Sequence, residues 1–394
     1  MNSINGNIKK SDVLSTVELF SGIGGFRIAC DALNIKTVWA NDINVLACNI
    51  YSNVFGTNEI VQGDIRELCK QVPQHDLLTA GFPCQPFSSA GKKEGIRDPR
   101  GTLFEEIIKV LTLSSPQFFV LENVKRLLSM EGGDHFATIL SALSELDYFV
   151  EWRLLNALDF DLPQNRQRIV IIGTRMQSID SGSISLVNNF ELKKIIQNDL
   201  GGLQGIKQWQ QLEEHRKRFP SWGLCYKGKF YAYDINQYLT RSTKLSIQSI
   251  LEKNPLPEFY MDSTTEKRID SSIFINKFVN GVRILYNQKG GARMGYTIFG
   301  TDGVAPTLTA SHSRHYERYK IGDRFRRLTN KEYARLQGFP DDHCATTSIF
   351  NQYGLYGNAV PPPLAKWVIQ NLINNKLPIN VLEPVAETQM NFEL

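Results

Sequence analysis

The chain has 394 residues, a net charge of +4, 42% hydrophobic and 21% charged residues, the composition of an ordinary globular protein with room for two domains. Its six cysteines form no C-x-x-C pair, which disfavours a zinc site and a disulfide framework. No apolar run approaches the ~18 residues of a membrane span, and the polar first residues lack the apolar segment of a signal peptide, so we expect a cytoplasmic protein without a membrane partner.

Residues 13–175 alternate short apolar segments with amphipathic ones. Strands are expected at 16–20, 37–41, 76–81, 118–122 and 169–173, and helices at 24–33, 44–55, 103–113 and 135–146. This alternation predicts β-α-β units and a parallel sheet covered on both faces. Residues 186–320 show no clear period, and helical patterns return only at 330–336 and 364–372.

A glycine-containing loop follows the first expected strand. Its sequence, Leu19-Phe20-Ser21-Gly22-Ile23-Gly24-Gly25-Phe26, opens a helix, where backbone N–H groups can approach a ligand closely. The dinucleotide fingerprint would need Gly where Arg27 stands. Asp42 and Asp64 end the next two strands, and carboxylates there suit a ribose diol and an adenine amino group, although each alone is more often a cap or a surface group. Together these residues favour a nucleoside ligand without a pyrophosphate.

One cysteine stands at a strand end. In Gly81-Phe82-Pro83-Cys84-Gln85-Pro86-Phe87-Ser88, Cys84 follows the apolar segment 77–80, at the edge where open α/β folds bind ligands. A thiolate in that position would be a strong nucleophile. A buried structural cysteine is the alternative. The polar segment 85–101 is either a surface loop or a lid over the ligand.

Further segments complete an ordered set. They are Glu122-Asn123-Val124, Gln164-Asn165-Arg166-Gln167-Arg168, Arg335-Leu336-Gln337-Gly338-Phe339-Pro340 and Tyr356-Gly357-Asn358-Ala359-Val360-Pro361. In order and wording, the set resembles the cytosine-carbon-5 DNA methyltransferases of bacterial restriction–modification systems, over residues 14–175 and 321–372. The resemblance implies an α/β fold of the Rossmann-like S-adenosylmethionine-dependent methyltransferase type, with a smaller, irregular β-rich target-recognition domain.

The resemblance also divides the chain. It implies that residues 1–185 form the catalytic and cofactor-binding domain, that 186–320 form the target-recognition domain, and that 321–394 return to the catalytic domain. The charge agrees with this division, because residues 201–330 carry 21 Lys and Arg against 11 Asp and Glu, whereas the rest carries 23 against 29. A basic middle favours a polyanionic partner, although a solvated surface gives the same imbalance.

The catalytic set implied by the resemblance is Cys84, Glu122, Arg168 and Arg166. Carbon 5 of cytosine is a poor nucleophile, so the Cys84 thiolate adds to carbon 6 and makes the ring enamine-like. Glu122, its pKa raised by burial, protonates ring nitrogen 3, and Arg168 holds the carbonyl oxygen. The methyl group comes from S-adenosyl-L-methionine, whose product is S-adenosyl-L-homocysteine. The target base must first be flipped out of the duplex.

The resemblance assigns the cofactor pocket as well. The expected lining is Phe20, Gly22, Ile23, Gly24, Gly25, Asp42, Ile43, Asp64, Ile65, Pro83, Leu103, Asn358 and Ala359. Asp42 would hold the ribose hydroxyls, and Asp64 with Ile65 the adenine. Two positions depart from the family pattern, since Asp42 stands where Glu is usual and Ile43 where an aromatic residue often covers the adenine. We therefore expect less stacking.

Double-stranded DNA is the implied partner. Gly290-Gly291-Ala292-Arg293 resembles a recognition loop, and Thr307-Leu308-Thr309-Ala310 resembles a marker within the target-recognition domain. The expected DNA contacts are Gln85, Ser88, Arg100, Arg293, Thr309 and Arg314. We expect a monomer that is paired functionally, without a stable complex, with a restriction endonuclease.

Three rival interpretations differ in class. An RNA methyltransferase of the same fold would share Cys84, Glu122 and Arg168, but the long basic middle favours duplex DNA. A nicotinamide-dependent oxidoreductase is disfavoured by Arg27. A catalytically inactive DNA-binding regulator is disfavoured by the intact catalytic set.

Overall fold

The computed structural model describes residues 13–83, 103–175, 209–235, 245–287, 296–308 and 317–374. Several residues expected to act in catalysis or DNA binding fall outside these ranges. They are Cys84, Gln85, Ser88, Arg100, Arg293, Thr309 and Arg314. Their roles stay predictions. Within the ranges that the structure describes, no helix has the length and apolar character needed to cross a membrane.

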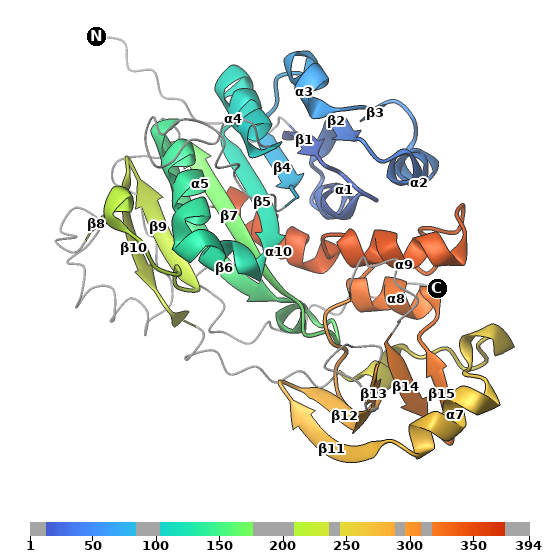
Figure 1. The fold of residues 1–394 in the computed structure, drawn as a ribbon. Helices are drawn as coiled ribbons and strands as arrows, with labels where there is room; N and C mark the ends of the chain where they lie inside the picture. The colour runs from blue at the N-terminus through green and yellow to red at the C-terminus, as the bar shows by residue number, and fades with distance from the viewer. Residues whose placement is uncertain are drawn as a thin grey trace, which may run out of the picture.

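The larger sheet, as far as the chain is described, has ten strands in the order β3-β2-β1-β4-β5-β7-β6-β9-β10-β8 (Figure 1). Its parallel half consists of β1 (Ser15–Leu19), β2 (Lys36–Asp42), β3 (Ile60–Gln62), β4 (Leu77–Gly81) and β5 (Phe118–Val124). The chain leaves β1 toward β2 and β3 on one side and continues with β4 and β5 on the other. This reversal of strand order is where open α/β sheets form their ligand crevice.

The other half of the larger sheet is antiparallel, which corrects the expectation of a wholly parallel sheet. It contains β6 (Tyr148–Asn156), β7 (Gln167–Arg175), β8 (Gln210–Gln211), β9 (Trp222–Tyr226) and β10 (Lys229–Tyr233). β7 pairs antiparallel with both β5 and β6. The connection between β6 and β7 holds only the 3₁₀ helix η3 (Ala157–Phe160), and a parallel neighbour would require a longer crossover.

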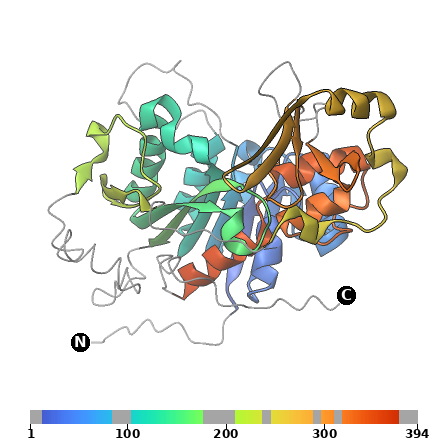
Figure 2. The same ribbon diagram turned by 90° about the horizontal axis from the view of Figure 1, so that it is seen from below.

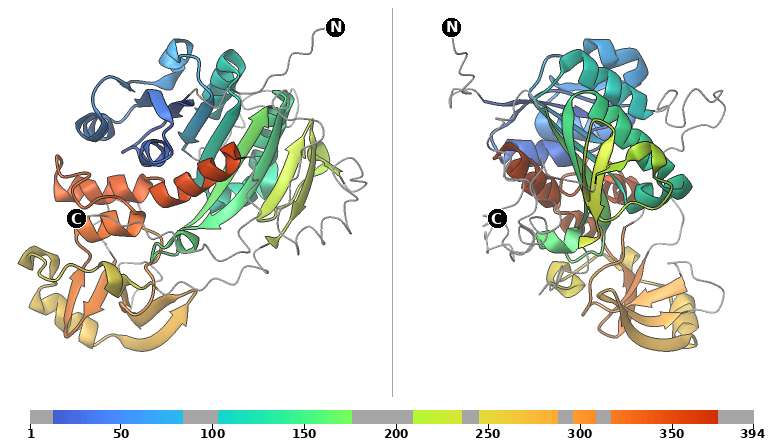
Figure 3. Two further views of the ribbon diagram at one scale, coloured as in Figure 1. Left: turned by 180° about the vertical axis from the view of Figure 1, so that it is seen from behind. Right: turned by 90° about the vertical axis from the view of Figure 1, so that its left-hand side faces the viewer.

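Helices cover both faces of the larger sheet, as expected. On one face, α1 (Gly25–Asp31) packs against α10 (Pro362–Ile373), which crosses the sheet in the view from behind (Figure 3). On the other face lie α4 (Leu103–Ser114) and α5 (Asp134–Glu145). Two further helices, α2 (Val45–Phe55) and α3 (Ile65–Leu68), follow β2 and β3. Among the described residues, the 3₁₀ helices besides η3 are η1 (Cys69–Gln71), η2 (Lys125–Gly133), η6 (Leu212–Glu214), η8 (Ile247–Ile250) and η9 (Pro257–Phe259).

A second, five-stranded sheet lies beside the first (Figure 2). Its strands are β11 (Ile273–Val279), β12 (Val282–Asn287), β13 (Thr297–Phe299), β14 (Arg318–Ile321) and β15 (Arg324–Arg327), and α7 (Ser263–Asp270), α8 (Asn330–Gln337) and α9 (Ile349–Asn358) accompany it. Its core residues Val282 and Tyr319 belong to the same hydrophobic cluster as Ile23 of the glycine loop. The second sheet therefore shares a hydrophobic core with the glycine loop at the end of β1.

The expected domain boundary at residue 186 does not coincide with a change of sheet. β9 and β10 lie in the range expected for target recognition, yet they extend the larger sheet next to β6. β14 and β15 reach past residue 320 and complete the second sheet. The division of the chain into functional domains stays a prediction.

A buried ion pair joins β15 to α8. Arg326 donates to both carboxylate oxygens of Glu332 at 2.7 Å, and both side chains are almost fully buried. Glu332 also accepts from the backbone N–H groups of Thr329, at 2.7 Å, and Glu252, at 2.8 Å. The Thr329 hydroxyl completes a capping box by accepting from the Glu332 N–H. One carboxylate therefore holds three parts of the chain together.

We predict that Glu332→Gln lowers the free energy of unfolding by about 3–5 kcal/mol, because it leaves the Arg326 cation buried without a countercharge. Urea titration measures the loss. The matched control is Glu266→Gln, which breaks the more exposed pair between Arg324 and Glu266 and should cost less than about 1 kcal/mol. Equal losses in the two variants would contradict the importance of the buried pair.

Candidate active site

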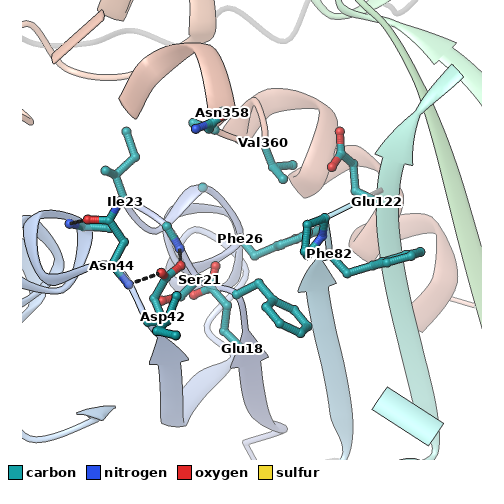
Figure 4. Close-up of a pocket in the computed structure, with 18 of the residues that line it drawn as sticks. Glu18, Ser21, Ile23, Phe26, Asp42, Asn44, Phe82, Glu122, Asn358 and Val360 are labelled. Carbon is teal, nitrogen blue, oxygen red and sulfur yellow. Dashed lines mark hydrogen bonds between the residues drawn. The ribbon is translucent and has the colours of Figure 1, made fainter. Parts of the chain in front are cut away.

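A cavity of ≈ 520 Å³ opens at the carboxyl ends of β1, β2, β4 and β5. Figure 4 shows Glu18 and Asp42 on neighbouring strands, with Asn358 and Val360 on the opposite side. Residues expected to bind the cofactor line this cavity, with one exception. Those present are Phe20, Gly22, Ile23, Gly25, Asp42, Ile43, Asp64, Ile65, Pro83, Leu103, Asn358 and Ala359. Glu122, Arg166 and Arg168 line it too, so the residues expected to bind the cofactor and those expected in catalysis share one cavity.

Two features determine the path of the glycine loop. They are the left-handed backbone conformation of Gly22 and the close approach of Gly25 to Val360. Gly22 has φ +55°, a conformation that L side chains rarely adopt. A Cβ at Gly25 would lie 2.1 Å from the carbonyl oxygen of Val360, so only glycine lets the carboxyl-terminal segment lie against the loop. Gly24 is the exception to the expected lining, because it faces the Phe55 ring on α2. A side chain at Gly24 would meet α2, whereas its expected contact with the cofactor stays a prediction.

Asp42 fixes the floor of the cavity. One carboxylate oxygen accepts from the Gly22 N–H at 2.8 Å, and the other accepts from the Asn44 N–H at 2.8 Å. Asn44 in turn caps α2, since its side chain accepts from the N–H groups of the first turn. Burial raises the pKa of the Asp42 carboxyl. Because a carboxylate offers about four acceptor sites, Asp42 keeps capacity for a ligand diol.

Asp64 occupies the next strand end and caps α3. Its carboxylate accepts from the Arg66 N–H at 3.0 Å and pairs with the Arg66 guanidinium at 2.7 Å. Hydrogen bonding to that side chain lowers the pKa of Asp64. Ile65 is buried beside it, whereas Ile43 is 64% exposed at the rim. The adenine site expected from these residues is thus polar at one edge and apolar at its walls.

Glu122 and Arg168 lie together at one end of the cavity. Glu122 is buried near the end of β5, and its Oε1 lies 2.8 Å from Arg168 Nε on β7. Burial raises the pKa of the Glu122 carboxyl, while Arg168 and Arg166 oppose that rise. The net effect is a raised pKa, so Glu122 still carries a proton to donate at a pH where an exposed glutamate has lost its own. The ion pair also holds the guanidinium beside the carboxyl.

The Arg166 guanidinium is occupied by hydrogen bonds to backbone carbonyls. Its Nη1 donates to the Leu308 carbonyl at 3.2 Å, and its Nη2 donates to the carbonyls of Gly357 and Ala359 at 2.9 and 3.1 Å. Burial and the nearby Arg168 cation lower the pKa of Arg166 to about 9. These contacts favour a positioning role for Arg166, which joins β7 to the segment carrying Asn358.

Glu18 is a cavity residue that the sequence analysis missed. It is 2% exposed on β1, and the Tyr51 hydroxyl donates to it at 3.3 Å. Burial raises the pKa of Glu18 to about 8, against the opposing effects of Tyr51 and Arg27. The sequence could have revealed Glu18 as a carboxylate inside the otherwise apolar strand of residues 15–19. Burying such a group without a compensating partner costs free energy, so its presence there points to a functional or structural partner.

His343 is a second residue that the sequence did not reveal. Its Nε2 lies 2.7 Å from the Ile23 carbonyl oxygen, and since a carbonyl only accepts, this nitrogen carries the proton. The ring is buried against Phe55 and Phe339. His343 thereby ties the segment before α9 to the glycine loop. Among the described residues, no group of His, Cys, Asp and Glu is arranged to hold a metal ion.

The fold and the cavity define an α/β enzyme with the Rossmann-like methyltransferase architecture. Comparison with known proteins specifies it further. A family model described as C-5 cytosine-specific DNA methylase matches residues 14–374. The chain belongs to this family and is a DNA (cytosine-5-)-methyltransferase of the restriction–modification type.

The alignments with curated relatives extend over almost the whole chain. The Type II methyltransferase M.BanI of Aneurinibacillus aneurinilyticus is 32% identical, with 92% of this chain and 96% of the relative covered. M1.ScrFI of Lactococcus lactis subsp. cremoris is 30% identical, covering 93% of this chain and 79% of the relative. M.HhaI of Haemophilus parahaemolyticus is 29% identical, covering 91% and 94%.

Among solved structures, the S. pombe Dnmt2 methyltransferase has a TM-score of 0.59 at 20% identity, covering 92% of this chain and 98% of that one. At this identity the likeness concerns the fold.

We predict that Glu18→Gln flattens the pH dependence of stability. The native pKa of Glu18, about 8, lies above its ordinary value, so the native state keeps a proton that the unfolded state releases. The contribution of this proton to the free energy of unfolding is fully present below the unfolded pKa. It is lost as the pH rises through about 8, at up to ~1.4 kcal/mol per pH unit.

Urea titrations of the free protein at pH 5, 6.5 and 8 measure this effect as the difference between variant and wild type. Other buried carboxyls contribute equally to both curves and cancel in that difference. The exposed Glu67→Gln serves as the control and should follow the wild type. Parallel curves for Glu18→Gln and wild type would contradict the assignment.

Proposed function

We propose that the protein transfers the methyl group of S-adenosylmethionine to carbon 5 of a flipped-out cytosine in a specific short site of duplex DNA, through a covalent adduct of Cys84 with carbon 6. The observation that carries this proposal is the shared cavity. Cofactor-type residues at the ends of β1 and β2 and the Glu122–Arg168 pair at the ends of β5 and β7 line the same space. Pro83, which precedes Cys84 in the chain, lines it as well.

The residues present fit S-adenosylmethionine. Backbone at Gly22 lies open on the loop side, Asp42 retains acceptor capacity for a diol, and Ile65 and Ile43 supply apolar surface. The Glu18 carboxyl adds a buried acceptor suited to an ammonium group. When bound, the cofactor supplies a methyl group made electrophilic by its sulfonium. The protein's own part is to hold it beside the base and to exclude water.

The remaining steps follow from the catalytic residues. The Cys84 thiolate forms a bond to carbon 6, and the electron pair of the 5,6 double bond moves toward ring nitrogen 3, which Glu122 protonates. Arg168 holds the Glu122 carboxylate and offers donors to the ring carbonyl oxygen. Carbon 5 takes the methyl group, and its proton leaves to a base. Elimination then returns the thiolate, and the proton on ring nitrogen 3 goes back to Glu122. The products are 5-methylcytosine, the demethylated cofactor and one proton.

Further parts of the proposal concern the partner. Residues 186–320 would read the DNA site, with Arg293, Thr309 and Arg314 among the contacts and Gln85, Ser88 and Arg100 contributing from the segment after the nucleophile. The enzyme would act as a cytoplasmic monomer and share its site with a restriction endonuclease without a stable complex. The relatives' designation as Type II methyltransferases supports that pairing.

We predict that Asp42→Ala weakens binding of S-adenosylmethionine by about 1–3 kcal/mol, or roughly 5- to 150-fold in Kd, since a charge-assisted acceptor for the ribose is lost. Titration calorimetry measures the affinity, and binding to duplex DNA should persist. The exposed Asp323→Ala is the control for removal of an acid elsewhere. An unchanged cofactor affinity in Asp42→Ala would place the ribose elsewhere.

We predict that duplex DNA with 5-fluorocytosine at the target position traps the enzyme covalently when S-adenosylmethionine is present. The fluorine cannot leave carbon 5 as a cation, so elimination of the thiolate is blocked. The adduct should survive a denaturing gel, and mass spectrometry should locate it on Cys84. Cys84→Ser should lose turnover and trapping, because a hydroxyl is far less ionised than a thiol.

Glu122→Gln gives the matched test of the proton donor. It should slow adduct formation without moving the adduct from Cys84, because the amide cannot protonate ring nitrogen 3. An adduct on Cys30, Cys48, Cys69, Cys225 or Cys344, or normal turnover by Cys84→Ser, would refute the mechanism.

A further inference from the structure

His343 connects the carboxyl-terminal part of the chain with the glycine loop. It lies between α8 and α9, and its Nε2–H donates to the Ile23 carbonyl at 2.7 Å across 320 residues of sequence. Ile23 lines the cavity expected to hold the cofactor (Figure 4), whereas His343 is not among the lining residues. The His343 ring therefore contacts a cavity residue without itself lining the cavity, and it can affect a bound ligand only through the loop.

This hydrogen bond helps to hold one peptide unit of the loop at both ends. The Ile23 carbonyl and the Gly24 N–H belong to the same planar trans unit, so they point in opposite directions. The carbonyl accepts from His343, and the N–H donates to the Ser21 carbonyl at 3.0 Å. Rotation of the unit would break both hydrogen bonds and would change the shape of the loop where it lines the cavity.

The sequence of the loop does not by itself determine the orientation of this peptide unit. Gly24 has φ +85°, and glycine adopts positive and negative φ about equally readily. The unit between Ile23 and Gly24 can therefore rotate at little steric cost. Asp42 holds the Gly22 N–H, which belongs to an earlier unit. A donor from outside the loop, His343, thus favours one orientation of the unit that follows Ile23.

The position of the His343 ring is itself fixed by its surroundings. The ring is buried and packs against Phe55 and Phe339, whose centroids lie 5.9 and 4.8 Å away. The segment that carries it is held to α8, because the Arg335 guanidinium pairs with Asp341 at 2.6 Å. Burial lowers the pKa of His343, which favours the neutral ring, and a neutral imidazole has one N–H to donate. The hydrogen bond to the loop uses that N–H.

We propose that His343 is a positioning residue for S-adenosylmethionine, which holds the glycine loop in the conformation that binds the cofactor. The proposal rests on the proposed function, since it takes the cofactor to bind in this cavity. Without the donor, the loop spends part of its time in a conformation that does not bind, and the apparent Kd rises as the competent fraction falls. Bound cofactor selects the competent loop, so the rate at saturating cofactor does not change.

Titration calorimetry and steady-state methylation of duplex DNA by the full-length enzyme test the proposal. His343→Phe keeps an aromatic ring between Phe55 and Phe339 but has no donor for the Ile23 carbonyl. It should raise the Kd and the KM for S-adenosylmethionine by about 5- to 20-fold. The kcat at saturating cofactor should stay within about twofold of the wild-type value, because only the population of the binding conformation has changed.

Two amide variants separate hydrogen bonding from ring packing. His343→Gln places an N–H donor at about the reach of Nε2, and it should bring the Kd back to within about threefold of the wild-type value. His343→Asn carries the same amide on a side chain one methylene shorter, which does not reach the Ile23 carbonyl, and it should resemble His343→Phe.

His75 provides the matched control. It is buried as well, and its Nδ1 lies 2.8 Å from the Pro73 carbonyl oxygen, but it is not among the residues that line the cavity. His75→Phe should leave the Kd and the KM unchanged, and urea titration of both Phe variants separates a loss of stability from a loss of affinity. An unchanged Kd in His343→Phe, or equal losses of affinity in the Gln and Asn variants, would overturn the inference. A wild-type enzyme that binds no S-adenosylmethionine would instead overturn the proposed function, and the inference with it.

Discussion

The buried guanidinium of Arg166 is the contact on which the assembled site depends. It leaves β7 and binds carbonyls of Leu308, Gly357 and Ala359, which belong to segments far apart in the sequence. The neighbouring backbone adds to the junction, since the Asn165 N–H donates to the Ala305 carbonyl at 2.8 Å and the Ala305 N–H donates to the Pro163 carbonyl at 2.8 Å. Because a buried cation must be compensated, these carbonyls cannot move away without a large cost. The second sheet, the end of α9 and the Glu122–Arg168 pair are thereby held in one arrangement.

Two arginines at the start of β7 have different partners. Arg166 turns inward to the backbone junction, and Arg168 lies beside Glu122 in the cavity. The pKa of Glu122 reflects both, because the two cations oppose the effect of burial. A glutamate buried without them would have a still higher pKa and would donate its proton less readily. The structure that fixes the chain thus also sets the acidity of the proposed proton donor.

The sequence was most informative where strand ends carry polar residues. Asp42, Asp64 and Glu122 could be placed because apolar strands of a β-α-β pattern end at one edge, and each was found there. The family resemblance supplied the roles. Gly24 is not among the residues that line the cavity, and its expected contact with the cofactor stays a prediction.

Other elements carried no readable signal. β6 was not predicted because Glu151 and Arg153 interrupt its apolar sequence, although Glu151 accepts from the buried Trp222 ring at 2.7 Å. α9 contains Gly354 and Gly357, which lower helix propensity. The second sheet has strands with little alternation, and its register depends on neighbours distant in sequence. Contacts such as that of His343 with Ile23 depend on tertiary packing alone.

The close approach of Gly25 to the Val360 carbonyl has a consequence for how the protein is made. The glycine loop leaves the ribosome early, whereas Val360, against which it lies, is synthesised much later. A nascent chain that ends before α9 has the strands and the loop without the enclosure that residues 357–360 provide. The enclosed cavity therefore forms only after residues 357–360 have been synthesised, well after the strands and the glycine loop.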